Sequence, residues 1–249
     1  MDFTIDIYGV LLRSLKNGGY NFTTFAELLE YSGEDNYKSL IIRHDVDKLS
    51  KNSLQFARIQ SKNGVKGSYY FRAVPESWNV EVIRQIASLG HEVGYHYETM
   101  DTANGDIDKA WDQFRFYLDE LRKLVEVKTI CMHGSPRSKY DNKAIWDKYD
   151  YRSLDLIGEP YYDMDFDEFF YLTDTGRRWD GWKTSVRDKV PQQEKWNDEG
   201  LVFHSTNDII NAANKGKLPD KIMMTFHPQR WHDGGWPWLK ELIVQNAKN

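Results

Sequence analysis

Two aspartates one residue apart follow an apolar segment in the sequence RHDVD, residues 43–47. Successive side chains of an extended strand alternate between its two faces, so Asp45 and Asp47 are expected to share one face. Their like charges would then repel each other. A bound cation, a shared proton or open water could offset this repulsion, and the other ionisable residues have to decide between these explanations.

Three histidines follow other apolar segments and could join the two carboxylates. His96, His133 and His227 each come at the end of a predicted strand. In α/β barrels the functional groups collect at the carboxyl ends of the strands. Zinc binds imidazole nitrogen and carboxylate oxygen, and a catalytic zinc keeps one position open for water. The sequence therefore predicts a divalent-metal site, with zinc as the expected ion, and the cation would also remove the repulsion.

Strand parity separates these histidines from two others. His44 directly precedes Asp45 in the sequence, so its side chain should point away from the face that carries both carboxylates. His91 lies five residues before His96, so in an extended segment the two side chains face opposite ways. Neither His44 nor His91 is therefore expected in the site.

The elements that must position these residues alternate between strands and helices. The predicted helices cover residues 24–31, 53–62, 80–89, 106–125, 142–148, 209–214 and 236–246. The predicted strands cover residues 38–43, 65–71, 92–96, 128–133, 151–156, 169–173, 201–204 and 221–227. Such alternation predicts a parallel sheet flanked by helices. We expect a distorted, incomplete (β/α) barrel of about seven parallel strands, formed by one domain over residues 1–249 with its core at about 38–232.

Composition narrows the function classes. The net charge of −5 argues against nucleic-acid binding, which normally requires a basic patch. The single cysteine, Cys131, excludes an internal disulfide framework and a cysteine-rich zinc site. The first twenty residues lack a long apolar segment, and no run of about 20 apolar residues occurs, so a cytoplasmic protein without a transmembrane segment is expected. The aromatic fraction of 14% is weak support for a glycan partner, because aromatic rings stack on sugar faces.

Four short segments together resemble a known family. RHDVD, GHEVGYH, HGSP and MMTFHPQRW, in this order and spacing, are similar to the motifs of the polysaccharide deacetylases of carbohydrate esterase family four. The likeness covers roughly residues 38–232 and is greatest to the branch associated with surface-polysaccharide biosynthesis. It implies a distorted (β/α) barrel, which agrees with the order of elements, and hydrolysis of N-acetyl groups on amino sugars with a divalent metal.

The resemblance also implies roles for individual residues. In the first motif Asp45 would be the catalytic base and Asp47 a metal ligand. His96 matches the first metal histidine of the second motif. His227 matches the histidine of the last motif, which acts as the general acid.

Two positions depart from the family pattern. Usual members have adjacent aspartates in the first motif, whereas Val46 intervenes here. The second metal histidine is expected four residues after His96, where this chain has Met100, whose thioether is a poor ligand for zinc. We expect His133 to supply the missing ligand, with Glu98 as the second candidate.

The leading hypothesis is therefore a metal-dependent deacetylase of an N-acetylated sugar in a polysaccharide or its precursor. Met100 leaves open a catalytically degenerate glycan-binding or scaffold protein, and the barrel leaves open a hydrolase of another, cyclic amide. Four residues in or beside the predicted rim loops are candidate substrate contacts: Arg137, Asp155, Asp174 and Arg178.

Overall fold

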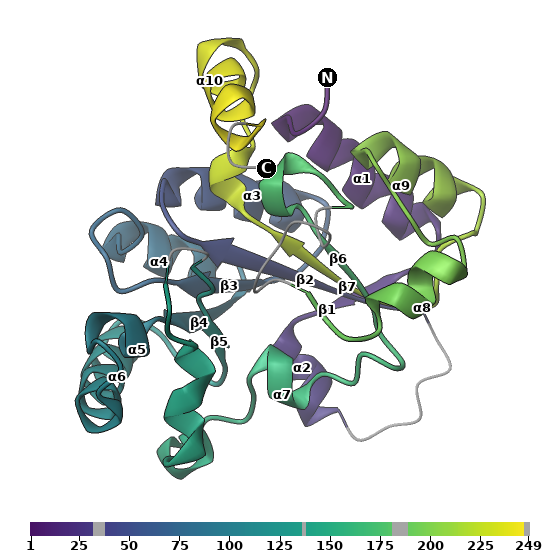
Figure 1. The fold of residues 1–249 in the computed structure, drawn as a ribbon. Helices are drawn as coiled ribbons and strands as arrows, with labels where there is room; N and C mark the ends of the chain where they lie inside the picture. The colour runs from purple at the N-terminus through teal and green to yellow at the C-terminus, as the bar shows by residue number, and fades with distance from the viewer. Residues whose placement is uncertain (32–37, 136–137, 181–188, 247–249) are drawn as a thin grey trace.

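A curved parallel sheet forms the centre of the computed structural model, which describes residues 1–31, 38–135, 138–180 and 189–246 (Figure 1). Its strands follow the hydrogen-bonded order β5-β4-β3-β2-β7-β6, and a short β1 pairs with the first residues of β2. No pairing joins the two end strands within those ranges, so the expected incomplete (β/α) barrel is confirmed. The strands are β1 (Asn21–Thr23), β2 (Ser39–Val46), β3 (Ser68–Phe71), β4 (Glu92–Tyr97), β5 (Ile130–Met132), β6 (Phe170–Thr173) and β7 (Lys221–Phe226).

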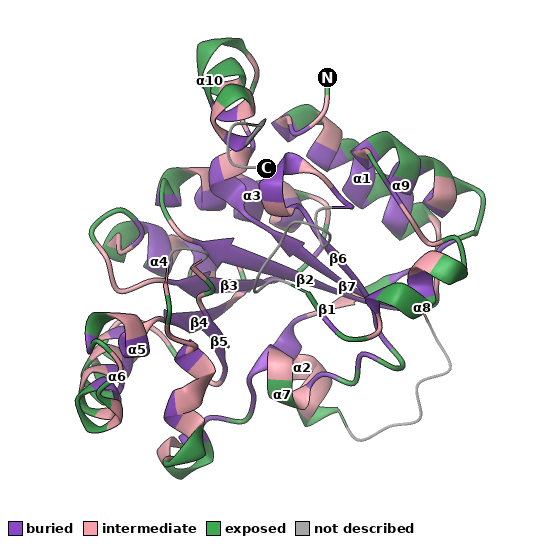
Figure 2. Ribbon diagram, viewed as in Figure 1, coloured by how far each residue is buried: buried purple, intermediate pink, exposed green. Residues whose placement is uncertain are grey.

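Helices surround the sheet, with buried faces toward it and exposed faces outward (Figure 2). Among the described residues, none of them is long and apolar enough to span a membrane. The α-helices are α1 (Ile5–Asn17), α2 (Phe25–Glu30), α3 (Ser50–Lys62), α4 (Val80–Ser88), α5 (Thr99–Thr102), α6 (Ile107–Arg122), α7 (Pro160–Asp163), α8 (Gln193–Asp198), α9 (Thr206–Asn214) and α10 (Gly235–Asn246). The 3₁₀ helices are η1 (Asn142–Asp147), η2 (Tyr151–Leu154), η3 (Thr175–Arg177) and η5 (Pro228–Arg230).

Side-chain caps fix the beginnings of two helices: α2 begins within one residue of its predicted start, and α9 begins three residues before the predicted residue 209. Thr24 and Glu27 form a capping box at α2, in which each side chain accepts a hydrogen bond from the other residue's backbone N–H. Ser205 and Asp208 form the same arrangement at α9. These reciprocal bonds satisfy backbone donors that a helix end would otherwise leave unpaired.

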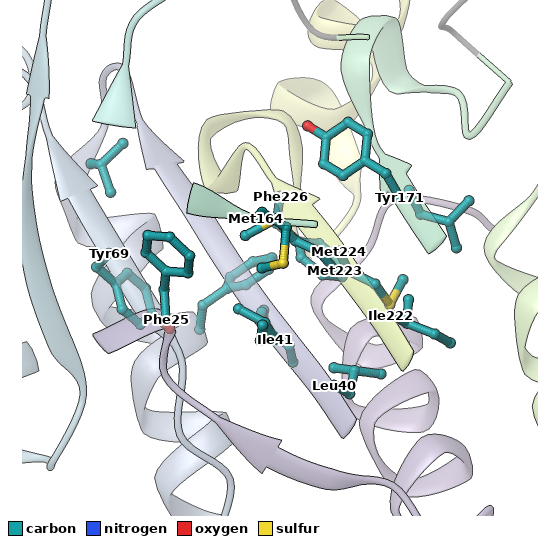
Figure 3. Packing of buried hydrophobic residues seen from close by; sticks show 14 of the residues in the cluster. Phe25, Leu40, Ile41, Tyr69, Met164, Tyr171, Ile222, Met223, Met224 and Phe226 are labelled. Carbon is teal, nitrogen blue, oxygen red and sulfur yellow. The ribbon is translucent and has the colours of Figure 1, made fainter. Parts of the chain in front are cut away.

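Strand β2 is buried along its whole length and lies in the middle of the core. Figure 3 shows Leu40 and Ile41 of this strand packed near Met223 and Met224 of the neighbouring β7. His44 points to the opposite face from Asp45, as parity predicts, and its ring stacks on Tyr69 with 3.9 Å between ring centroids. Burial lowers the pKa of His44 to about 3, so this histidine is a neutral core residue.

His91 is likewise absent from the cluster of site residues. Its Nε2 lies 2.9 Å from the carbonyl oxygen of Ala57 in α3, and the side chain is buried. Both histidines that parity separated from the site are therefore used in packing.

A side chain, in place of a further strand, covers the outer edge of β5. Ile130 donates its N–H to the carbonyl of Gly158 at 3.0 Å. The next N–H on that edge, from Met132, is accepted by the fully buried carboxylate of Glu159 at 2.9 Å. Burial raises the pKa of Glu159 to about 7. The edge is thus closed without completing the barrel.

Two predicted strands are wrong. Residues Tyr151–Leu154 form the 3₁₀ helix η2, because the side chain of Asp150 caps the N–H of Arg152 and turns the chain. Residues 201–204 form no strand, and Phe203 packs its ring on Phe170 of β6, with 6.2 Å between centroids. A short apolar run meets the burial requirement of a strand and of a packed turn equally well, so the pattern alone does not separate them.

Helix α1 was not predicted, although its sequence carries the signal. Thr4 caps its first turn, and its buried residues recur at helical spacing. The helix packs beside α9 and also contacts α3 (Figure 1). The buried residues are Ile5, Tyr8, Gly9, Leu11, Leu12, Ser14 and Leu15.

Gly94 in β4 allows the sheet to curve closely beside His96, and its replacement tests this packing. A Cβ atom there would lie 2.4 Å from the ring of Tyr70 and 2.7 Å from the carbonyl oxygen of Thr129. Because the strand partners cannot move apart without losing pairing, we expect Gly94→Ala to lower the free energy of unfolding by about 1–3 kcal/mol. Chemical denaturation measures this change.

Gly9 provides a matched control for the same substitution. It lies inside α1, where an added Cβ atom would meet only the end of the Arg13 side chain at 3.4 Å. Alanine is favoured over glycine in a helix interior, so Gly9→Ala should raise the free energy of unfolding by about 0.5–1 kcal/mol. Equal effects of the two substitutions would contradict the close packing at Gly94.

Candidate functional site

The carboxyl ends of four strands bring the predicted chemistry to one edge of the sheet. Asp45 lies in β2 and Asp47 directly after it, and His96 lies in β4, next to its last residue. His133 and His227 each follow directly after a strand, β5 and β7. Since β2 pairs with β7 while β3 separates it from β4, these segments lie along one curved edge. Asp47 and His227, which are 180 positions apart in the sequence, thereby come to the same edge of the sheet.

Asp45 is held by an arginine of its own strand. Both nitrogens of the Arg43 fork donate to its carboxylate, Nε to Oδ1 and NH2 to Oδ2, each at 2.9 Å. Arg43 and Asp45 are 1% and 4% exposed, so this ion pair is almost free of solvent. A bidentate arginine–carboxylate pair fixes the direction as well as the charge of the carboxylate.

Arg43 was not among the predicted site residues. It lies two residues before Asp45, so the parity that paired the aspartates also predicts Arg43 on their face. Nη2 of Arg43 donates to the hydroxyls of Tyr161 and Tyr171 at 3.1 and 3.5 Å, and the Arg43 guanidinium lies over both rings. Burial alone would lower the pKa of Arg43, but the negative charge of Asp45 holds it well above its usual value.

Asp47 has different partners from Asp45. Its Oδ2 accepts a hydrogen bond from Nε2 of Gln229 at 2.8 Å. Its Oδ1 is buried and has no hydrogen-bond partner among the described residues. This oxygen lies 3.6 Å from Nε2 of His96 and 3.5 Å from Nε2 of His133. Burial would raise the pKa of Asp47, but His96, His133 and His227 together hold it well below its usual value.

Each imidazole near Asp47 has a partner behind it. Nδ1 of His96 lies 2.9 Å from the backbone carbonyl oxygen of Cys131, and Nδ1 of His133 lies 2.9 Å from Oε2 of Glu98. An acceptor at Nδ1 favours the tautomer with its proton on that nitrogen. The lone pair of His96 Nε2 is then available on the side of Asp47, whereas the Glu98 contact is out of line for a hydrogen bond to Nδ1 of His133.

These three side chains fit a metal ion. The ligand atoms of Asp47, His96 and His133 all lie within 4.8 Å of one another. Tetrahedral zinc with bonds of 2.0–2.1 Å separates its ligand atoms by about 3.3–3.5 Å, close to the two distances from Asp47 Oδ1. A buried carboxylate oxygen without a donor, facing two imidazole nitrogens, is the environment that a divalent cation would complete.

A second group of possible ligands overlaps the first. Asp45, His96 and Cys131 also offer ligand atoms within 4.8 Å of one another. Both oxygens of Asp45, however, already accept hydrogen bonds from Arg43. The oxygen available for a cation is therefore Oδ1 of Asp47.

Met100 does not belong to either group. Its side chain is buried in the hydrophobic core at α5, and its N–H donates to Oδ1 of Asn142 at 3.0 Å. His133 lies where a third ligand is needed, while Glu98, the second candidate, lies behind His133 and pairs with Arg72.

His227 is the other imidazole of this edge, and a buried carboxylate orients it. Oδ1 of Asp174 lies 2.6 Å from Nδ1 of His227, and both Asp174 oxygens accept the His227 backbone N–H. Burial and the charge of Arg230 lower the pKa of His227, but Asp174 and Asp47 outweigh them and raise it. Since Nδ1 is engaged, Nε2 is the ring nitrogen that could exchange a proton with a bound molecule.

The predicted substrate contacts lie in different places. Asp174 is fully buried and also accepts a bond from Nε1 of Trp231 at 2.6 Å, so it supports His227 and does not line a surface. Asp155 is exposed at the end of η2, beside Lys128, which precedes β5, and therefore lies near the opposite edge of the sheet. Arg178 forms a bidentate ion pair with Asp180. Arg137 lies outside the described residues.

Comparisons with known proteins give distant structural likenesses. No protein-family model and no curated protein matches the sequence. The chain is similar to a carbohydrate esterase family 4 pseudoenzyme from Bacillus anthracis, with 14% identity and a TM-score of 0.47 over 88% of this chain and 62% of that one. It thus spans less than two thirds of that protein.

Two further solved structures are similar at the same level. A family 4 carbohydrate esterase from Bacillus anthracis shares 11% identity, with a TM-score of 0.45 over 95% of this chain and 84% of that one. PdaA from Bacillus subtilis, a family 4 carbohydrate esterase, shares 12% identity, with a TM-score of 0.42 over 96% and 84%. Because these likenesses are distant, the role of this chain has to follow from its own residues.

The pair of Asp174 and His227 generates a pH-dependent prediction. A histidine whose folded pKa is raised stabilises the fold below its unfolded pKa of about 6.5, and this stabilisation is lost as the pH rises through the folded pKa. Asp174→Asn should lower the pKa of His227, as measured by NMR titration. It should also lower the free energy of unfolding by about 1–3 kcal/mol near pH 6, and by less as the pH rises.

Asp180→Asn is the matched control. Asp180 also pairs with a histidine, His204 at 3.0 Å, but the His204 side chain is 71% exposed. Asp180→Asn also breaks the pair with Arg178, so the comparison uses the pKa of His227, which this control should leave unaltered. An unaltered His227 pKa in Asp174→Asn would refute the assigned role of this carboxylate.

Proposed function

We propose that this chain is a metal-dependent hydrolase that removes N-acetyl groups from an amino sugar of a polysaccharide or its precursor. The observation that carries the proposal is the buried Oδ1 of Asp47, which has no donor among the described residues and faces Nε2 of both His96 and His133. The motif resemblance supplies the substrate class. Asp47, His96 and His133 would hold the cation.

In the proposed reaction the two aspartates have different tasks: Asp47 would hold the cation, and Asp45 would act as the base. A divalent cation in the site would polarise an acetyl carbonyl and make a nearby water molecule more acidic. Arg43 holds Asp45 in one orientation. Asp45 takes a proton from the water molecule as the water oxygen forms a bond to the carbonyl carbon. Each carboxylate oxygen has a second lone pair, so Asp45 can take a proton while it accepts the two hydrogen bonds from Arg43.

His227 completes the reaction as the general acid. Its raised pKa keeps a larger fraction of the imidazole protonated near neutral pH, and Asp174 fixes the ring. Nε2 gives a proton to the nitrogen of the amide as the carbon–nitrogen bond breaks, which yields acetate and the free amino sugar. Asp45 and His227 thereby have opposite tasks in one turnover.

Asp45→Asn tests the assigned base. Positioned acid–base groups contribute about 10²–10⁴-fold, so turnover of an N-acetylated sugar oligomer should fall at least ~10²-fold. Zinc content, measured by elemental analysis, should remain that of the parent because Asp45 is not one of the three proposed ligands. Asp112→Asn, at an exposed ion pair with Arg115, should change neither value. Equal turnover in Asp45→Asn would remove this residue from the mechanism.

His133→Gln and Met100→Leu together test the ligand set. His133→Gln removes a proposed ligand and should make the zinc content substoichiometric. Met100→Leu conserves volume at a buried core position and should keep the parent zinc content, with a stability change below about 1.5 kcal/mol. The opposite result would indicate that position 100 supplies the ligand.

The parent chain itself separates this function from its rivals. Substoichiometric zinc after supplementation would favour a non-catalytic glycan-binding protein, as Met100 alone would suggest. Stoichiometric zinc with turnover of small cyclic amides, and none of N-acetylated sugars, would favour the cyclic-amide hydrolase. A panel of both substrate classes distinguishes these outcomes.

A further inference from the structure

Glu98 lies directly behind His133 and has no role in the acid–base chemistry proposed above. It follows the last residue of β4 and its side chain is 13% exposed. Oε2 of Glu98 lies 2.9 Å from Nδ1 of His133, although the contact is off the direction of the N–H bond. Its position therefore allows it to influence the ring from the side opposite to Asp47.

Arg72 fixes the Glu98 carboxylate at that position. Its Nε donates to Oε1 at 3.1 Å, and its NH2 contacts Oε1 and Oε2 at 2.8 and 2.7 Å. A third nitrogen, NH1, donates to the backbone carbonyl of Asp47 at 3.3 Å. One guanidinium thus ties Glu98 to the segment that carries Asp47, so the distance between Asp47 and His133 depends on this pair.

The charge of Glu98 suits a position behind a metal-binding imidazole. Both of its oxygens pair with the Arg72 guanidinium, so the group behind His133 is a carboxylate with a fixed direction. A carboxylate that receives the Nδ1 proton orients the ring, selects the tautomer with Nε2 unprotonated and makes Nε2 more basic.

His96 has a partner of another kind and serves as a reference. Its Nδ1 faces the backbone carbonyl of Cys131, which no side-chain substitution removes. The two imidazoles can therefore be affected independently. A change at Glu98 should alter His133 and leave His96 as it is.

We propose that Glu98, held by Arg72, is a positioning residue of the metal site that fixes the tautomer and orientation of His133 toward Asp47. This assignment rests on the proposed metal-dependent function and deepens it. It also accounts for the departure at Met100: the third ligand comes from β5, and the residue two positions after His96 supports that ligand from behind.

Zinc affinity tests the proposal without reference to turnover. Loss of a partner behind a metal-binding histidine lowers metal affinity about 10–100-fold, so Glu98→Gln should weaken zinc binding by that factor in competition with a chelator. Arg72→Lys leaves Glu98 in place but removes the fork, and it should produce a smaller loss in the same direction. This second variant carries the test if Glu98→Gln does not fold.

The tautomer of His133 in zinc-free protein is the second readout. Long-range ¹H–¹⁵N spectra, assigned with His133→Gln, should show the parent His133 ring protonated on Nδ1. In Glu98→Gln the His133 ring should lose this preference, while the His96 signals stay unchanged. A merely structural role for Glu98 would not alter one ring selectively.

Glu92→Gln is the matched control on the same strand. Glu92 begins β4 at the opposite edge of the sheet, where its carboxylate accepts hydrogen bonds from Ala26 and Ser68. The zinc affinity of the Glu92→Gln protein should equal that of the parent. Parent-like affinity and an unchanged His133 tautomer in Glu98→Gln would overturn the assignment. Failure of the parent to bind zinc would overturn the metal-dependent function, and the assignment with it.

Discussion

Two negative charges on one face of one strand are the constraint on which the whole site depends. Asp45 is buried, and so is Oδ1 of Asp47, so each carboxylate needs partners that offset its charge at this edge. Arg43 neutralises the first through a bidentate pair, and two imidazoles face the second. The different partners give the two aspartates different chemistry, although one residue separates them in sequence. The curvature of the sheet matters because it brings His96 and His133, which come from β4 and the end of β5, close to Asp47.

Much of the fold was predictable because burial and capping act locally. Six of the eight predicted strands are present, and helix α2 begins within one residue of its predicted start. The misses occur where a short apolar run has two acceptable outcomes. Residues 151–154 form a 3₁₀ helix because Asp150 caps the turn, and a sequence pattern contains no measure of that competition.

The site was predictable to the extent that it follows from strand parity and strand ends. Parity separated His44 from the aspartates, and strand ends gathered the histidines that lie together. Arg43 obeys the same parity rule, because it lies two residues before Asp45 and therefore shares its face of the strand. Asp174 was expected to contact substrate, whereas its burial beside His227 depends on how β6 and β7 pair, which is a tertiary property.

Met100 has a consequence for how related genes are recognised. A search pattern that demands histidine at that position would discard this chain, because it tests spacing along the polypeptide. The same nitrogen donor is available from β5, where His133 approaches Asp47 across the mouth of the barrel. In the proposed site the second nitrogen donor would follow β5 and would not lie in the segment after β4, so a pattern of spacing within one segment would not find it.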